Sequence, residues 1–354
     1  MKTEHLHRFR DYGFNPGLLP PGKRNKISDV AKVQVGHCTR IEGDTIRTGV
    51  TIIDPGIPDL FHHKIPAAVA VGNGFGKLVG TTQLQELGTL ETPIALTNTL
   101  AVGSVMHGLV ELVLKTTKHI GESTTVNAVV GETSDAIVND IHRIVLGKSE
   151  VDTAYASRTR DFALGSVGAG TGTSVFSWKG GIGSASRKIT IGKRKYLLGA
   201  LLQTNFGGAL TIMGVPVGKL LGATSFDKFI STQNGGSCMI IIATDAPISA
   251  RQLGRIARRA MLGLGKTGSI MGHGSGDYAI AFSTNRSGVE GVSASPCLPD
   301  TELDPFFLAA VETVEESVYD SLFTSKTVTG RNNKTLHQIP VDKVVKILNQ
   351  YLRR

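Results

Sequence analysis

The chain has 354 residues, of which 40% are hydrophobic and 19% are charged. That balance excludes a disordered chain, and the length suffices for one large domain or two ordinary ones. The net charge of +9 comes from basic residues spread along the chain, without a long basic run interleaved with aromatics. A solvated basic surface is therefore favoured over a nucleic-acid interface.

The first half of the chain predicts an irregular arm, then strands and a helix. Residues 1–28 carry proline and glycine and are expected to form the arm. Apolar residues at helical spacing predict a helix over Val102–Thr117, and the polar residues 148–164 are expected to be a surface excursion. Short β-branched runs bounded by glycine, proline or asparagine predict four strands: Val50–Ile53, Ala67–Val71, Ile94–Thr97 and Val126–Val130.

The second half predicts a hairpin followed by alternating strands and helices. Two apolar runs, Ile189–Ile191 and Tyr196–Leu202, flank a basic turn and read as a β-hairpin. Ser249 with Gln252 forms a capping box ahead of an amphipathic helix that ends near Gly265. The remaining predicted elements are strands at Cys238–Ala243 and Tyr278–Phe282, a helix that opens at Asp304–Pro305, and a final helix at Val341–Leu352.

The order of these elements indicates one continuous α/β domain over residues 1–354, with neither a repeat nor a low-complexity linker. Two sheets between helical layers would fit this order, although the pattern alone does not separate that arrangement from other α/β folds.

The cysteines and the N-terminal residues indicate the cellular compartment. The chain has three cysteines, Cys38, Cys238 and Cys297, and such a small, odd number does not form a disulfide framework, so we expect a reducing, cytoplasmic setting. Residues 1–14 are charged and lack an apolar signal region. No continuous apolar run is long enough for a membrane span, so we expect no membrane partner.

We also expect neither a metal nor a cofactor. The chain has no H-E-x-x-H or C-x-x-C motif, and the adjacent His62 and His63 would point in different directions on most backbones.

The tetrapeptide Asn234–Ser237, Asn-Gly-Gly-Ser, stands directly before the predicted strand Cys238–Ala243. By itself this pattern favours a turn that enters a strand. The alternative is chemical, because two glycines permit backbone angles closed to other residues. A strained Gly236–Ser237 bond can be attacked by the serine Oγ, and hydrolysis of the resulting ester frees an N-terminal serine. Its α-amine, with a pKa of about 7.7–8.0, can then serve as the base for its own hydroxyl.

Such chemistry needs a donor for the oxyanion and polar partners for the amine. Asn205, which follows the apolar run Tyr196–Leu202, has a side-chain amide suited to the first role. Ser275 and Asp277 stand just before the strand Tyr278–Phe282 and suit the second. Each of these residues, taken alone, would read as a turn residue.

Taken together, the motifs resemble the self-processing aminopeptidases that include L-aminopeptidase/D-amidase and β-peptidyl aminopeptidase. The resemblance covers nearly the whole chain, and the order and spacing of its parts are specific. Its segments include Ile27–Val30, Asn73–Gly76, Val130–Thr133, Gly168–Gly172, Lys179–Gly183, Gln203–Gly207, Gly236–Ser237, Ala243–Pro247 and Gly274–Asp277.

This resemblance implies a four-layer αββα fold and cleavage between Gly236 and Ser237. The products are an α chain, 1–236, and a β chain, 237–354, whose pairs assemble into homo-oligomers, often tetramers. It implies a hydrolase acting on short peptides, amides or esters. The implied roles are Ser237 as nucleophile, Asn205 at the oxyanion, Ser275 and Asp277 orienting the nucleophile and its amine, and Glu132 facing the substrate's amino group.

Two features depart from the family pattern. Family members carry a tyrosine near the Glu-Thr motif that helps the oxyanion, whereas here no tyrosine occurs between Thr125 and Ala154, and the next is Tyr155. Cys238 follows the nucleophile and is interpreted as a small buried strand residue. Two other functions stay open: an acyltransferase of the ornithine acetyltransferase type, which usually frees a threonine, and a member that folds and oligomerises without processing.

Overall fold

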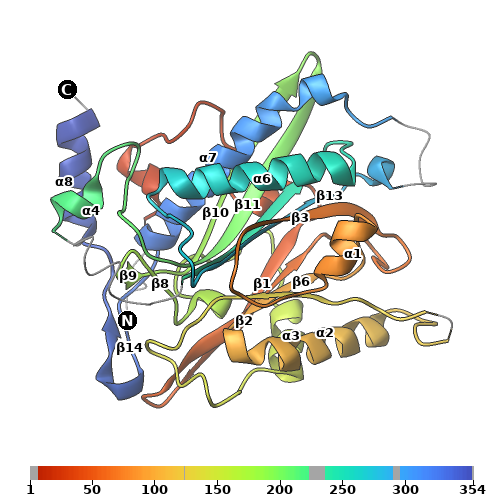
Figure 1. The fold of residues 1–354 in the computed structure, drawn as a ribbon, viewed down its shortest axis with the longest axis horizontal. Coiled ribbons are helices and arrows are strands. Elements are labelled where there is room, and N and C mark those ends of the chain that lie inside the picture. Colours follow the sequence, from red (N-terminus) through yellow and green to blue (C-terminus); the bar gives the residue numbers. More distant parts are fainter. Residues whose placement is uncertain (1–6, 123, 223–235, 290–295, 353–354) are drawn as a thin grey trace.

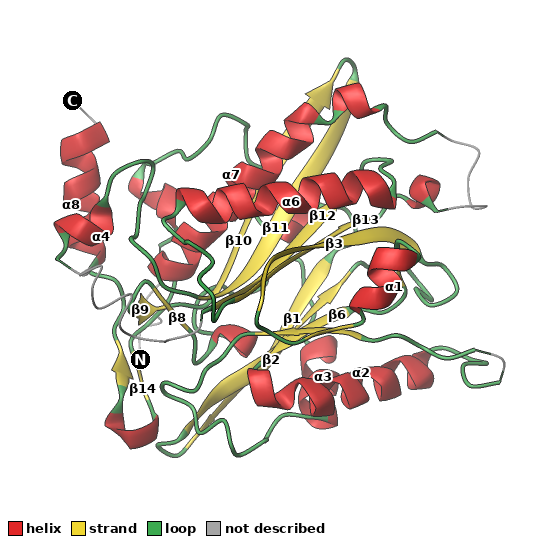
Figure 2. Ribbon diagram, viewed as in Figure 1, coloured by secondary structure: helices red, strands yellow, loops and turns green. Residues whose placement is uncertain are grey.

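Two β-sheets lie face to face, and a pair of helices covers the outer face of each (Figures 1 and 2). The computed structural model describes residues 7–122, 124–222, 236–289 and 296–352. This arrangement confirms the predicted αββα layers.

The first sheet has five strands in the order β1-β2-β6-β7-β4. Its outer face packs on α2 (Val102–Thr116) and α3 (Lys148–Ala156) through a cluster of buried apolar side chains. The strands are β1 (Gln34–Glu42), β2 (Ile46–Asp54), β4 (Leu78–Val79), β6 (Ile94–Thr97) and β7 (Val129–Glu132).

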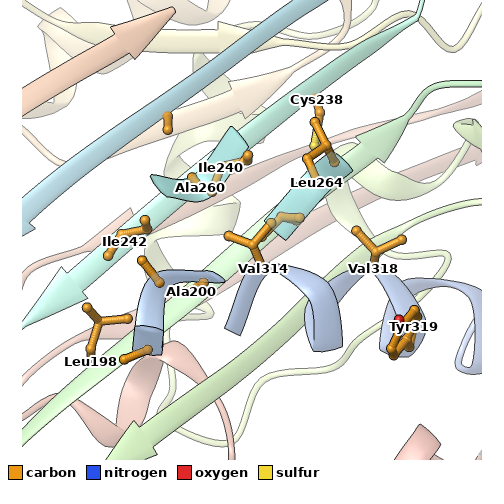
Figure 3. Packing of buried hydrophobic residues seen from close by; sticks show 14 of the residues in the cluster. Leu198, Ala200, Cys238, Ile240, Ile242, Ala260, Leu264, Val314, Val318 and Tyr319 are labelled. Atoms are coloured by element: carbon orange, nitrogen blue, oxygen red, sulfur yellow. The ribbon is translucent and has the colours of Figure 1, made fainter. Parts of the chain in front are cut away.

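The second sheet has six strands in the order β10-β11-β12-β13-β3-β5. Its outer face packs on α6 (Ala250–Lys266) and α7 (Asp304–Phe323), whose side chains interlock with those of β11 and β12 (Figure 3). The strands are β3 (Ile65–Gly74), β5 (Thr89–Leu90), β10 (Ile182–Ile191), β11 (Arg194–Asn205), β12 (Ser237–Thr244) and β13 (Gly276–Ser283).

Each sheet contains one parallel pair joined by a helix on its outer face. In the first sheet β6 leads through α2 to β7, and in the second β12 leads through α6 to β13. A parallel pair needs such a crossover because a tight turn cannot join strands that run the same way. The smaller elements are α1 (Thr81–Glu86), α4 (Val217–Leu220), α8 (Val341–Leu352), β8 (Ser174–Val175), β9 (Trp178–Lys179), β14 (Val328–Thr329) and β15 (Thr335–Leu336).

Most long elements match the predicted ones, and the 148–164 segment is the main correction. The expected surface excursion contains α3, which begins where the Glu150 side chain accepts the Gly147 N–H at 2.9 Å. Only Val151 and Ala154 supply its buried apolar face. Two apolar residues in a polar stretch are too weak a periodic signal to predict a helix.

Helix α2, with the turn before it, is long and apolar enough by composition to span a membrane. The stretch Thr99–Thr116 reaches a mean hydropathy of 1.2. Its side chains Val105, Leu109 and Leu112 are buried in the cluster under the first sheet. This packing accounts for its apolar face.

A buried ion cluster fastens the N-terminal arm and β10 to α7. Arg187 on β10 is fully buried and forms ion pairs with Glu312 and Glu316 on α7, at 2.7 Å each. In the arm, Arg10 pairs with Glu316 at 2.6 Å and the Leu18 N–H donates to Glu312 at 2.6 Å. Three distant segments therefore depend on the same two carboxylates.

Replacing Arg187 by Met should destabilise the fold by about 3–5 kcal/mol, because two buried carboxylates lose a partner. The measurement is urea unfolding in a Ser237→Ala background, which removes the predicted nucleophile of self-cleavage. The matched control is Arg194→Met, whose 2.6 Å pair with Glu302 lies on the surface and should contribute no more than about 1 kcal/mol. Equal effects of the two variants would contradict this account of the cluster.

Candidate active site

Three segments far apart in the sequence meet at one end of the second sheet. The antiparallel pairing of β11 with β12 sets Asn205 opposite Ser237, and the parallel pairing of β12 with β13 sets Ser237 beside Gly276. Directly opposed side chains on antiparallel strands have Cβ atoms about 4.5–5.5 Å apart. The Asn205 amide and the Ser237 hydroxyl are therefore neighbours.

Strand alternation decides which way each side chain points. Met239 and Ile241 pack between the two sheets, whereas Cys238 and Ile240 face α6 and α7 (Figure 3). Ser237 therefore points into the space between the sheets. Cys238 is wholly buried among apolar side chains, and burial raises the pKa of its thiol well above the usual value. Its interpretation as a core residue is confirmed.

The Gly236–Ser237 bond is tightly packed by neighbouring atoms. The Gly236 carbonyl accepts the Gly276 N–H at 3.1 Å. A Cβ at position 236 would lie 3.2 Å from Ser275 Oγ and 3.1 Å from the Cα of Phe206, tighter than ordinary contacts. A glycine therefore suits this position, and the Ser275 hydroxyl lies beside the bond. Asn234 and Gly235, the start of the motif, lie outside the described residues.

Ser275 and Asp277 are buried without the hydrogen bonds that buried polar groups normally make. Within the described part of the chain, Ser275 Oγ and both Asp277 carboxylate oxygens have no well-formed partner. Burial raises the pKa of Asp277 to about 6, and the nearby Ser275 hydroxyl acts in the opposite direction. Unpartnered buried oxygens cost free energy, so they mark a place where a partner is expected.

Asn205 is held from one side only. Its Oδ1 accepts the backbone N–H of Ser174 at 3.0 Å. Among the described residues the Nδ2 group donates to no acceptor, so the donor end of the amide is available toward Ser237. An anchored amide with a free N–H is suited to stabilising an oxyanion.

Glu132 reaches the site from the first sheet. It is buried at the end of β7, where Oε1 accepts the Lys77 N–H at 2.9 Å and Oε2 accepts the Thr99 hydroxyl. Gly76 separates it from Gly276. A Cβ on Gly276 would lie 2.6 Å from the Cα of Gly76, and a Cβ on Gly76 would lie 3.1 Å from the Glu132 carboxylate. The two glycines let the sheets approach closely here.

A tyrosine does stand near Glu132, but it comes from β13. The Tyr278 hydroxyl donates to the Gly76 carbonyl at 2.9 Å and accepts the Gly76 N–H at 3.1 Å. Its burial and the charge of Glu132 raise the pKa of Tyr278. Tyr155 instead stacks 3.2 Å from the Arg158 guanidinium, beside a cavity of about 310 Å³ at the opposite end of the first sheet.

Asn73 is a second residue that the sequence did not single out. Its Nδ2 donates to the carbonyl oxygens of Gly272, His273 and Ser275, at 3.1, 3.0 and 2.5 Å. It thereby holds the turn that carries Ser275. The motif Asn73–Gly76 was visible in the sequence, but a side chain that binds a turn two hundred residues away leaves no local pattern.

The structure thus brings Asn205, Ser237 and Ser275 together at one sheet end and places Glu132 across from them. Asp277 lies at the same sheet end but is paired with Cys238, so its side chain is on the helix-facing side of the sheet, opposite to Ser237. Within the described ranges, no three His, Cys, Asp or Glu side chains are grouped so that they could hold a metal ion.

The sequence profile of peptidase family S58 matches residues 25–336. The chain therefore belongs to that family and is an aminopeptidase of the N-terminal-nucleophile class, as its motifs predicted. It is 38% identical over 368 residues to the β-peptidyl aminopeptidase BapA of Sphingosinicella xenopeptidilytica, a match covering 96% of this chain and 90% of that protein. The BapA of Sphingosinicella microcystinivorans is 34% identical, with 98% and 93% covered.

Solved structures share the fold over nearly the whole chain. The PH0078 protein of Pyrococcus horikoshii OT3 superposes with a TM-score of 0.91 at 42% identity, covering 98% of this chain and 99% of that one. The L-aminopeptidase D-Ala-esterase/amidase of Ochrobactrum anthropi gives 0.87 at 32% identity, covering 97% and 98%. It is described as a prototype of the serine aminopeptidases and a variant of the Ntn hydrolase fold.

Asp277→Asn should stabilise the uncut chain at neutral pH. The folded-state pKa of Asp277, about 6, lies above the unfolded value of 3.8, so stability falls as pH rises between them. Both variants are compared in a Ser237→Ala background. The increase in the free energy of unfolding caused by Asp277→Asn should be near zero at pH 3.5 and reach about 2–3 kcal/mol at pH 8. Urea unfolding at both values measures it, and a gain independent of pH would contradict the assignment.

Proposed function

We propose that the chain cuts itself between Gly236 and Ser237 and then removes N-terminal residues from short peptides, amides or esters. The observation that carries this proposal is the buried Ser275 hydroxyl, which lies beside the Gly236–Ser237 bond and has no well-formed hydrogen-bond partner among the described residues. A cut there creates an α-amino group, which can supply the partner that this hydroxyl lacks.

In the cut, Ser237 Oγ attacks the carbonyl carbon of Gly236 and its proton passes to the leaving nitrogen. The C–N bond breaks, the acyl group moves to oxygen, and water hydrolyses the ester to leave a Gly236 carboxylate and a free N-terminal Ser237. The Gly276 N–H already donates to the attacked carbonyl oxygen at 3.1 Å. Such a donor stabilises the negative charge that develops on that oxygen.

After the cut, the same serine supplies nucleophile and base. The Ser237 α-amine takes the proton of Oγ, and Oγ attacks the carbonyl of the substrate. The Asn205 Nδ2 group donates to the resulting oxyanion. Asp277 and Ser275 hold the amine. Burying these two side chains without partners costs free energy, and an ammonium group that forms at the site would recover part of it.

Glu132 selects substrates with a free amino group. Its carboxylate faces Gly276 across Gly76, on the other side of the site from Asn205. A charge-assisted hydrogen bond from a substrate ammonium to this carboxylate would restrict cleavage to the first residue of a peptide. The relatives named β-peptidyl aminopeptidase and L-aminopeptidase support an N-terminal peptide or amide substrate.

The assembled enzyme is a cytoplasmic homo-oligomer, a tetramer of αβ pairs. The family resemblance supports assembly, and exposed apolar side chains at Val71, Phe75 and Ile270 are candidates for a covered surface. Three cysteines without disulfides support a reducing compartment.

Ser237→Ala should give a chain that stays in one piece and loses hydrolysis of a small-residue p-nitroanilide, because the variant lacks the attacking oxygen. Mass spectrometry and the release of nitroaniline measure both effects. Cys238→Ala is the matched control, because Cys238 lies in the apolar core, and it should cut itself and hydrolyse normally.

Hydrolysis that survives in Ser237→Ala would contradict the proposal. An uncut but folded wild type would favour a member that does not process. Acetyl transfer to an amine that outruns hydrolysis would favour the acyltransferase alternative.

Glu132→Gln should lower kcat/KM roughly 10- to 100-fold for a substrate with a free amino group, because a charged hydrogen bond becomes neutral. The preference for that substrate over its N-acetylated form should shrink accordingly. Glu122→Gln, which removes an exposed carboxylate, should leave both rates unchanged. A preference for the free amine that survives in Glu132→Gln would show that another group binds the amine.

A further inference from the structure

Lys179 is a buried cation that the proposed reaction does not use. It lies on β9 and is fully buried. Its ammonium group donates to the carbonyl oxygens of Gly170, Thr173 and Gly180, at 2.8, 2.9 and 2.5 Å. All three of its N–H donors are thereby used. No carboxylate of the described chain forms an ion pair with it. Burial lowers the pKa of Lys179 to about 7, although the charge of Asp135 acts in the opposite direction, so burying this group is costly and needs a reason.

The three carbonyls belong to the two sides of one small hairpin. Gly170 and Thr173 lead into β8, and Gly180 follows β9. Thr173 is joined to the other side by a second bond, since its carbonyl also accepts the Gly180 N–H at 3.1 Å. Lys179 therefore closes the base of the β8–β9 hairpin from the inside.

The hairpin holds the end of β11 at two points. The N–H of Ser174, directly after Thr173, donates to Asn205 Oδ1 at 3.0 Å. The N–H of Phe176 donates to the Phe206 carbonyl at 2.8 Å, and the two rings pack edge to face with centroids 5.2 Å apart. The same hairpin thus orients the side chain of Asn205 and the backbone of Phe206.

The turn of this hairpin is strained. Phe176 and Ser177 have φ values of +51° and +71°, the left-handed region that favours glycine. A bulky side chain persists there only where its surroundings hold it, and such strain gathers at functional sites. The bonds from Lys179 are among the interactions that hold this turn.

We propose that Lys179 is a positioning residue for Asn205: its three hydrogen bonds fix the β8–β9 hairpin so that the Ser174 N–H orients the Asn205 amide toward the oxyanion. This inference rests on the proposed function, in which Asn205 stabilises that charge. Lys179 itself touches neither the substrate nor the reacting atoms. Its influence reaches the reaction through Thr173 and Ser174.

A double-mutant cycle tests the proposal on fully cut protein, with wild type, Lys179→Met, Asn205→Ala and the double variant. Lys179→Met should lower kcat roughly 10- to 100-fold and change KM less than about twofold, because a displaced donor weakens only the transition state. In the Asn205→Ala background the same change should cost less than about twofold, since the group it positions is absent. Lys188→Met, which changes an exposed lysine of β10, is the matched control and should equal wild type.

Equal losses from Lys179→Met in the two backgrounds, or a rise in KM alone, would overturn the proposal. Lys179→Gln, which retains two N–H donors, should give a smaller loss than Lys179→Met and supplies the comparison if the Met variant does not fold or cut. Failure of both variants to fold would also overturn it, because Lys179 would then stabilise the whole chain. A wild type that neither cuts nor hydrolyses would instead refute the proposed function.

Discussion

The pairing of three strand ends, Asn205 with Ser237 and Ser237 with Gly276, is the constraint on which the rest of the site depends. A slip of one residue between β11 and β12 would turn Ser237 toward the helices and bring Cys238 between the sheets. The register is protected by the core, because β12 is buried on both faces and each face is packed by a different apolar cluster. The packing of the two hydrophobic layers thus specifies the position of a single hydroxyl.

The site itself is destabilising, and the fold offsets its cost elsewhere. Among the described residues, Asp277 and Ser275 are buried without well-formed partners, and Lys179 is buried without an ion pair. Against these stand the two apolar layers and the ion cluster around Arg187. That cluster has a second consequence under the proposed cut. Arg187 would belong to the piece 1–236 and its two glutamates to 237–354, so the cluster would tie the two pieces together beside the β11–β12 ladder.

The sequence carries most of the sheet and helix positions because apolar runs and helical spacing are local signals. Strand β6 and helix α8 have the predicted bounds, and β12 begins one residue earlier than predicted, at Ser237 itself. Helix α3 was missed because few of its residues are apolar. The candidate site was predictable only as a set of motifs in order. Contacts such as Asn73 with the 272–275 turn, or Tyr278 with Gly76, join distant segments and cannot be read from spacing.

The central claim is that Ser237 becomes a chain terminus, and the identity of that terminus tests it most directly. N-terminal sequencing of the purified wild-type protein, after incubation at neutral pH and separation under denaturing conditions, should find a chain that begins Ser-Cys-Met-Ile-Ile, starting at Ser237. A single chain that begins at the original N-terminus, in protein that nevertheless hydrolyses aminopeptidase substrates at full rate, would contradict the account.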